Sequence, residues 1–329
     1  ATALKYEDEV QSILKEKLGL KEEDQISTIN ATDLGGLAKS KNISSANRIA
    51  VILAEGDIVD GNVEGAISSE KFAKEIRKAR KDENIKAIVL RVNSPGGSIL
   101  ASDVIWREMS EAKKVKPVIV SMGEVAASGG YYIAAPADTI VAQPNTITGS
   151  IGIFGILFNV QELVNDKLGV TTDVVSTGEL SDFGNMARPL TEVERTIIQS
   201  SVEDGYETFI SRVAEGRGMH PDSVRKVASG RVWTGTQAKA RGLVDVLGGL
   251  DTAIGIAAAK IKAGEDYRVV YYPEKKPWFE ELMVSFSDQV QVRILQTQLG
   301  DQYPLYQKIQ RLKNYQGVQV RMPQEIVIK

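Results

Sequence analysis

The sequence predicts an α/β protein with a largely parallel β-sheet. Short apolar runs of strand length alternate with longer segments whose apolar residues recur at helical spacing. One of these runs, residues 117–122, is typical of a buried strand and leads directly into a glycine-rich turn. Strands that alternate with helices are typical of βαβ units, in which the strands lie parallel.

The predicted elements follow one another closely. Helical spacing over residues 6–18 ends at Gly19, and residues 25–46, rich in Ser, Asn, Thr and Gly, are predicted to be a linker. From Arg48 on, the order is strand 49–53, helix 72–79, strand 85–92, helix 101–115, strand 118–122, helix 130–135 and strand 139–142. Helices are then predicted over 192–217, 232–247, 250–261 and, after the clear alternation ends, 279–299.

Composition excludes several classes of function. With a net charge of −3 and a pI near 5.6, the chain has no basic face for nucleic acid. It has no cysteine and one histidine, His220, which excludes thiol catalysis, disulfides and a metal site with several histidines in one chain. We therefore expect no metal and no cofactor.

The chain has no apolar stretch approaching the roughly 20 residues that span a bilayer. It begins Ala1-Thr2-Ala3, without an initiator methionine or a signal sequence. We therefore expect a piece of a longer protein, in which an anchor or export signal lies upstream.

Ser128 has the setting of an acyl-transfer nucleophile. It lies in Val125-Ala126-Ala127-Ser128-Gly129-Gly130, a predicted strand-to-helix turn. Its small neighbours let another backbone or a peptide approach the hydroxyl closely.

A second glycine turn follows the preceding strand, in Asn93-Ser94-Pro95-Gly96-Gly97-Ser98. The carboxyl ends of parallel strands lie at one edge of a sheet, where ligands bind. The amide of Gly129 and that of Gly96 or Gly97 could therefore converge on one oxyanion. A turn that merely needs glycine for a positive φ is the alternative for each motif.

A serine nucleophile needs a base, and the chain offers no convincing one. His220 lies in a Gly-Met-His-Pro loop and is expected at the surface or at a helix cap. Lys113, Lys114 and Lys116 form a charge run typical of a solvated face, and Lys167 is expected at an exposed helix end.

Several motifs together resemble the signal peptide peptidase A (protease IV) family. They are Arg91–Ser98, Ala126–Tyr131, Thr148-Gly149-Ser150-Ile151-Gly152-Ile153 and Val232-Trp233-Thr234-Gly235 with the stretch 238–245. They cover residues 48–262 in order and at compatible spacing. The resemblance implies a Clp protease/crotonase fold, built of stacked βαβ units, and cleavage of residual signal peptides by a Ser-Lys dyad.

Carried over by position, the resemblance makes Ser128 the nucleophile, and Gly129 with Gly96 or Gly97 the oxyanion hole. Ser150 matches the serine that holds the catalytic lysine; an N-cap or turn serine is the alternative.

The chain departs from short-form members of the family at the base. Their lysine lies in a Ser-Gly-x-x-Lys-Asp segment, and here Thr177-Gly178-Glu179-Leu180-Ser181-Asp182 puts Ser181 at that position. The resemblance is therefore to the C-terminal, serine-bearing half of a long form, whose N-terminal half supplies the lysine. We expect three parts: a segment that joins the chain to the upstream half (1–46), the protease domain (47–262) and a C-terminal extension (263–329). The predicted helix 279–299 of the extension could serve assembly or could instead pack on its own domain.

The resemblance also implies apolar peptide substrates, a homo-oligomer, and an upstream anchor in the bacterial inner membrane with the catalytic part facing the periplasm. Leu100, Tyr131, Ile153 and Phe154 are candidate subsite residues, each of which could instead belong to the core. Two rivals remain open: a crotonase-type acyl-CoA enzyme, for which Glu124 is the one nearby carboxylate, and a catalytically silent peptide-binding or assembly subunit.

Overall fold

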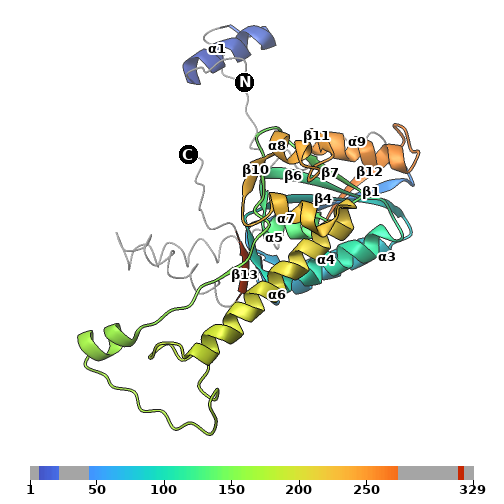
Figure 1. Cartoon of the computed structure of the whole chain (residues 1–329). Helices are drawn as coiled ribbons and strands as arrows, with labels where there is room; N and C mark the ends of the chain where they lie inside the picture. Colours follow the sequence, from blue (N-terminus) through green and yellow to red (C-terminus); the bar gives the residue numbers. More distant parts are fainter. Residues whose placement is uncertain (1–6, 22–43, 273–317, 322–329) are drawn as a thin grey trace. The chain divides into compact units, whose positions relative to one another are not determined.

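The computed structural model describes residues 7–21, 44–272 and 318–321 (Figure 1). The chain divides into two compact units, residues 1–40 and 41–329. The first unit contains the helix α1 (Glu7–Leu18), which ends at Gly19 with a φ of +67° as predicted.

A largely parallel, eight-stranded sheet forms the centre of the second unit. Its strands lie in the order β10-β8-β6-β4-β1-β12, while β7 pairs with β6 and β11 pairs with β7. All of these pairs are parallel except that of β10 with β8. The strands are β1 (Arg48–Glu55), β4 (Ile85–Ser94), β6 (Val118–Ala127), β7 (Thr139–Ala142), β8 (Ile147–Gly149), β10 (Val232–Thr234), β11 (Val246–Leu247) and β12 (Arg268–Tyr272).

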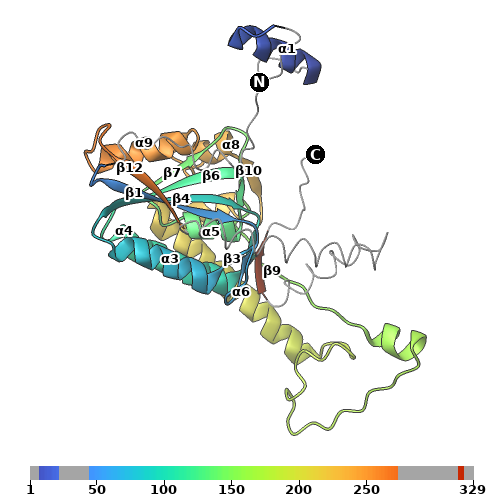
Figure 2. The ribbon, with the colours of Figure 1, turned by 180° about the vertical axis from the view of Figure 1, so that it is seen from behind.

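Helices cover both faces of this sheet (Figures 1 and 2). Alternate residues of each strand point to opposite faces, so that Ile49 and Val51 pack with α9 (Leu250–Lys260) while Ala50 and Ile52 belong to the larger core on the other face. The helices of that face are α3 (Ser69–Lys81), α4 (Ile99–Lys113), α5 (Gly129–Ala134), α6 (Glu192–Arg217) and α7 (Pro221–Val227).

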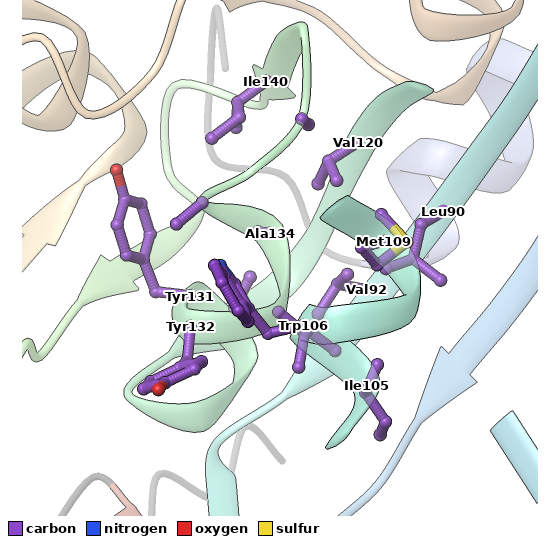
Figure 3. Close-up of a cluster of buried hydrophobic side chains, with 14 of the residues drawn as sticks. Leu90, Val92, Ile105, Trp106, Met109, Val120, Tyr131, Tyr132, Ala134 and Ile140 are labelled. Carbon is purple, nitrogen blue, oxygen red and sulfur yellow. The ribbon is translucent and has the colours of Figure 1, made fainter. Parts of the chain in front are cut away.

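The larger core is closely filled by aliphatic and aromatic side chains. Figure 3 shows Tyr131 and Tyr132 of α5 among Trp106 and the strand residues Leu90 and Val120. Both tyrosines are completely buried, and their hydroxyls find partners: Tyr131 donates to the carbonyl oxygen of Leu243 and Tyr132 to Asp103. This packing fixes α5, and with it the turn that carries Ser128.

A second, five-stranded sheet has the order β3-β2-β5-β13-β9. Its strands are short: β2 (Ile58–Val59), β3 (Ile67–Ser68), β5 (Gly96–Ser98), β9 (Phe154–Gly155) and β13 (Val318–Arg321). The strand β5 is the Gly-Gly turn that follows β4, so the predicted oxyanion glycines are part of this sheet.

The predicted order of strands and helices is confirmed over most of the core, and the helix at residues 192–217 has the predicted bounds. The helix predicted over residues 232–247 is wrong. Here β10 comes first, a capping box of Thr234 and Gln237 starts the short α8 (Gly235–Ala240), and Gly242 at φ +75° turns the chain into β11. Val232 and Trp233 favour a strand, and residues 232–247 split into three elements.

The helix predicted over 279–299 lies outside the described residues. The division of the chain at residues 46 and 262 stays a prediction. The strand β12, which follows residue 262, pairs with β1 in the main sheet. In the part of the chain that the structure describes, no helix is long and apolar enough to cross a membrane.

Candidate active site

Ser128 joins β6 to α5 in a conformation that is rare for a residue with a side chain. Its φ and ψ are 54° and −114°, and it has no exposed surface. A non-glycine residue held at positive φ is strained, and such strain gathers at functional sites. The backbone is held on both sides: the Ser128 N–H donates to the carbonyl oxygen of Gly149 at 2.8 Å, and Tyr132 N–H donates to that of Ser128 at 2.8 Å.

The glycines around this turn permit close packing. A Cβ atom on Gly130 would lie 2.7 Å from the carbonyl oxygen of Ser94, and one on Gly97 only 1.9 Å from that of Ile58. Gly129 is the first residue of α5, and the first N–H groups of a helix have no partner within it. The Gly129 N–H is therefore a candidate backbone donor next to Ser128.

The pairing of β4 with β6 places the two glycine turns side by side. Ser94 pairs with Ala126, and each stands two residues before its key residue, Gly96 or Ser128. Gly96 has a φ of +107°, and its N–H donates to the hydroxyl of Ser94 at 3.1 Å. To bind an oxyanion, the Gly96 N–H must first break its hydrogen bond to the Ser94 hydroxyl.

The pairing of β6 with β8 places Ser150 beside Ser128. Ala127 pairs with Gly149, so the two serines are the next residues of adjacent parallel strands. Ser150 is buried, has a φ of 48°, and its N–H donates to the carbonyl oxygen of Arg231 at 2.8 Å. The expected neighbourhood of Ser128 and Ser150 is thus present in the fold.

An open cavity of about 460 Å³ lies next to these serines. Ser150 and Gly152 line it together with Ile153, Phe154, Val202, Glu203, Tyr206, Ser229 and Gly230. The hydroxyl of Ser128 donates to the carbonyl oxygen of Gly152 at 3.3 Å, so its proton points to a residue that lines this cavity.

The described lysines offer no base beside Ser128. The one with a pKa lowered by burial is Lys116, and its Nζ donates to the carbonyl oxygens of Ala79 and Asp82. It precedes β6, whereas Ser128 follows that strand; ten residues of strand separate them by about 30 Å. Lys116 is half-buried and so departs from the solvated face predicted for its charge run.

His220 is exposed and caps α7, where its side chain accepts from the N–H of Asp222, as predicted. Ser181 is also exposed, and its hydroxyl donates to the carbonyl oxygen of Gly178. Neither residue has a contact with Ser128. Among the described residues, no group of three or more His, Cys, Asp or Glu side chains could hold a metal ion.

Residues 156–191 form an arm that leaves the body after β9 and returns at α6 (Figures 1 and 2). Arg188 closes its base by bonding to the carboxylates of both Asp182 and Glu194. These hydrogen bonds hold the pKa of each carboxyl group down at about 2. The arm exposes many large apolar side chains: Leu157, Phe158, Leu163, Leu168, Val170, Val174, Val175, Leu180, Phe183 and Met186.

The candidate subsite residues lie in different places. Tyr131 is a core residue (Figure 3), so it is unavailable to a peptide. Leu100 is 65% exposed just after β5, while Ile153 and Phe154 line the cavity beside Ser150. The strands β5 and β9 were not predicted, because strands of three and two residues carry almost no periodic signal.

Comparisons with known proteins identify the fold and the family of the chain. The model of Peptidase family S49 matches residues 110–264, and that of Clp protease matches residues 40–148. Together with the parallel sheet, the second match confirms the predicted Clp protease-like fold.

The relatives include Protease 4 of Salmonella typhi, 46% identical over 75% of this chain, and the chloroplastic serine protease SPPA of Arabidopsis thaliana, 38% identical over 83% of it. This chain covers only 40% and 42% of their lengths. An Enterococcus faecium relative with the provisional name signal peptide peptidase SppA is 36% identical, over 70% of this chain and 68% of its own length. The chain therefore belongs to peptidase family S49.

Proposed function

We propose that this chain is the nucleophile-bearing part of a serine protease of the signal peptide peptidase kind, with Ser128 as the attacking residue. The observation that carries the proposal is the strained conformation of Ser128 at the β6–α5 junction, with the first amide of α5 beside it and the Gly96 turn on the neighbouring strand. The relatives' names, Protease 4 and serine protease SPPA, support the same activity.

The proposed reaction is acyl transfer in two steps. Ser128 Oγ attacks the carbonyl carbon of a peptide bond while a base takes the hydroxyl proton. The C–N bond then breaks, and the base returns that proton to the leaving amine. Water hydrolyses the ester and restores the hydroxyl. The amide of Gly129, with that of Gly96 or Gly97, stabilises the negative oxygen in each step.

We propose that the base is a lysine of another domain. The sequence has Ser181 where short-form members have the lysine, and the described lysines do not contact Ser128. The chain spans about two fifths of its longer relatives, so those proteins have room for a second, lysine-bearing half. To be neutral near pH 7, such a lysine needs a pKa roughly three units below 10.4, which desolvation can supply.

The proposed substrates are apolar peptides, and the proposed assembly is an oligomer that includes the lysine-bearing half. The exposed apolar side chains of the arm are the surface best suited to such a contact. Anchoring at the inner membrane, with the catalytic part in the periplasm, is a proposal that rests on the family resemblance alone.

A reconstitution experiment tests the proposed function. The chain is mixed or co-expressed with the N-terminal half of a long-form relative, and hydrolysis of an apolar peptide ester is measured. We expect activity with the intact chain, and loss of at least about 10³-fold with Ser128→Ala. Ser201→Ala, on the exposed side of α6, is the matched control and should retain full activity.

A fluorophosphonate probe separates the rivals. Labelling at Ser128 in the reconstituted assembly supports the protease, whereas turnover of an acyl-CoA without labelling supports the crotonase-type enzyme. If Ser128→Ala is as active as the intact chain, Ser128 is not the nucleophile. An inactive but peptide-binding assembly would instead indicate a silent subunit.

A further inference from the structure

The strand β6 contains a bulge a few residues before Ser128. Val92 of β4 pairs with Met122 of β6, and the next pair is Ser94 with Ala126. Between these two pairs β4 advances by two residues and β6 by four, so β6 contains two extra residues. The bulge lies inside the main sheet, because β6 pairs with β4 on one side and with β7 and β8 on the other (Figure 2).

The bulge decides which residue after β4 stands level with Ser128. If the pairing of Val92 with Met122 continued without a bulge, Ser128 would stand opposite Ser98. Counted from the pair that follows the bulge, Ser128 stands opposite Gly96, a difference of about 6.6 Å along the strand. A shift of two residues keeps every side chain on its own face of the sheet. Strand order makes the two turns neighbours, and the bulge brings Ser128 level with the glycine turn.

Two side chains bind the backbone of the bulge from opposite sides. On the side of β4, the Oδ1 atom of Asn93 accepts from the N–H of Val125 at 3.2 Å. On the side of β8, the hydroxyl of Thr146, which is 1% exposed, donates to the carbonyl oxygen of Gly123 at 2.7 Å. A bulge interrupts the hydrogen bonds between strands, and a buried backbone group without a partner is costly. Asn93 and Thr146 therefore stabilise the bulge.

The side chain of Asn93 lies directly against the bulge. A Cβ atom on Gly123 would lie 2.9 Å from the Oδ1 atom of Asn93 and 3.0 Å from its Cβ and Cγ atoms, so glycine leaves the room that this side chain needs. Glu124 is exposed, whereas Met122 and Ala126 on either side of it belong to the larger core. The bulge thus turns Glu124 outward and keeps the flanking residues in the core.

We infer that Asn93 and Thr146 are positioning residues for Ser128: they hold the bulge that aligns Ser128 with the Gly96 turn, and they act through the backbone of β6. This inference rests on the proposed function, because it takes Ser128 to be the nucleophile and the Gly96 turn to supply an oxyanion donor. Bulges are frequent next to active sites, where they re-aim a side chain. A misplacement of about 1 Å at a reacting group can cost about 10²-fold in rate.

Kinetics of the reconstituted assembly test the inference with three asparagine variants. Asn93→Ala removes the acceptor of the Val125 N–H, whereas Asn93→Asp keeps an acceptor oxygen in the same place. Asn84→Ala is the matched control, because Asn84 is exposed and precedes β4 at the end far from Ser128. For each variant, kcat and KM are measured with the apolar peptide ester, and the thermal unfolding midpoint is measured on the same preparation.

We expect Asn93→Ala to lower kcat by about 10²-fold and to keep KM within about twofold, because the lost bond aligns Ser128 and does not bind substrate. Asn93→Asp should keep kcat within about threefold of the unsubstituted chain, and Asn84→Ala should change nothing. An unchanged kcat in Asn93→Ala, equal losses in Asn93→Ala and Asn93→Asp, or a loss that the unfolded fraction explains would each overturn the inference. If the unsubstituted chain is inactive in the assembly, the proposed function fails and the inference with it.

Amide hydrogen exchange separates the inference from the proposed function, because it needs no activity. In the chain by itself, the Val125 N–H should exchange at least about tenfold faster in Asn93→Ala than in Asn93→Asp or the unsubstituted chain. The Val120 N–H, in the regular part of β6, should be unaffected. Equal exchange of Val125 in all three proteins would show that Asn93 does not hold the bulge. Faster exchange with an unchanged kcat in an active assembly would show that the bulge does not position Ser128.

Thr146 provides an independent test from the other side of the bulge. Thr146→Val keeps the shape of the side chain and removes both hydrogen bonds of its hydroxyl, to the carbonyl oxygen of Gly123 and from the N–H of Gln143, whereas Thr146→Ser keeps them. We expect kcat to fall at least about tenfold in the valine variant, and to stay within about threefold in the serine variant. Thr208→Val, on the exposed side of α6, is the matched control. Equal activities of the valine and serine variants would show that the Thr146 hydroxyl does not position Ser128.

Discussion

The hydroxyl of Ser128 donates a 3.3 Å hydrogen bond to the carbonyl oxygen of Gly152. An amide carbonyl cannot take the proton away, so the serine rests as a neutral alcohol in this arrangement. A base that activates Ser128 must replace Gly152 as the acceptor. Because Gly152 and Ser150 both line the cavity of about 460 Å³, this cavity is the natural approach for an amine from another domain.

Ser150→Ala should impair catalysis without impairing the fold. In the reconstituted assembly we expect kcat to fall by about 10² to 10³, because the lysine loses a positioning hydroxyl. The measurement is the pH–rate profile of kcat/KM for a peptide ester together with the thermal unfolding midpoint.

The profile separates positioning from a structural effect. If Ser150 holds the lysine, its removal shifts the acidic limb of the profile, since the lysine pKa depends on that contact. A lower unfolding midpoint with an unshifted limb would contradict the assignment. Ser201→Ala, on α6, should change neither quantity.

Gly130→Ala should destabilise the turn that carries Ser128. The added methyl group would lie 2.7 Å from the carbonyl oxygen of Ser94, a backbone atom that cannot turn aside. Overpacking of this kind typically costs about 1 to 3 kcal/mol. Urea unfolding followed by fluorescence should show this loss, together with reduced labelling of Ser128 by a fluorophosphonate in the assembly.

Gly178→Ala is the matched control for that substitution. A Cβ atom there meets nothing within 4 Å, and Gly178 is not among the glycines with positive φ. We expect its stability to equal that of the unsubstituted chain to within about 0.5 kcal/mol. Equal stabilities of the two variants would mean that the β4 and β6 turns are not as closely packed as described.

The main sheet could be predicted from sequence because its strands are long, apolar and separated by amphipathic helices. The apolar runs at residues 85–92 and 118–122 predicted the strands that the structure extends to 85–94 and 118–127. The helix α6 is marked by a Thr191 capping box and by Gly218. The adjacency of Ser128 and Gly96 followed from parallel strand order alone.

The second sheet could not be predicted in this way. Its strands have two to four residues, and β13 pairs with Ser98 across more than 200 residues of sequence. No local pattern encodes so distant a partner. The sequence also gives no sign that Tyr206 and Ser229 line the cavity. Tyr206 belongs to the apolar stripe of α6, and Ser229 lies in an ordinary turn 23 residues away.

The two tyrosines of α5 should limit stability at high pH. Burial raises the pKa of Tyr131 and of Tyr132 above the ordinary value of 10. A folded pKa above the unfolded one contributes stability that is complete below about pH 10 and is lost as the pH rises beyond it. Absorbance at 295 nm should show exposed tyrosines ionising gradually, and these two only together with unfolding.

Tyr131→Phe checks the origin of that effect. The variant loses one buried phenol, so its unfolding midpoint should fall less steeply above pH 10. Its midpoint at pH 7 should be lower, because the carbonyl of Leu243 loses the hydroxyl that donates to it at 2.9 Å. An unchanged alkaline slope would contradict the assignment.

The base of the arm should be sensitive to acid. Asp182 and Glu194, both paired with Arg188, have pKa values lowered to about 2, against about 4 in an unfolded chain. A lowered folded pKa contributes stability that is complete above the unfolded value and is lost as the pH falls from about 4.5 toward 2. Pepsin should therefore cut within residues 156–191 increasingly fast over this range.

Glu194→Gln tests whether that carboxylate is responsible. The side chain of Glu194 is fully buried and also accepts from the Thr191 N–H at 2.7 Å, so the variant should lose the charge and keep the shape. We expect faster cleavage of the arm at pH 4.5 and a weaker dependence of the rate on pH below it. Glu192→Gln is the control, because the side chain of Glu192 lies on the same helix turn and is 94% exposed. Pepsin should cleave this variant at the same rate as the unsubstituted chain. If both variants behave alike, the general charge of the helix start, and not the buried pair with Arg188, holds the arm in place.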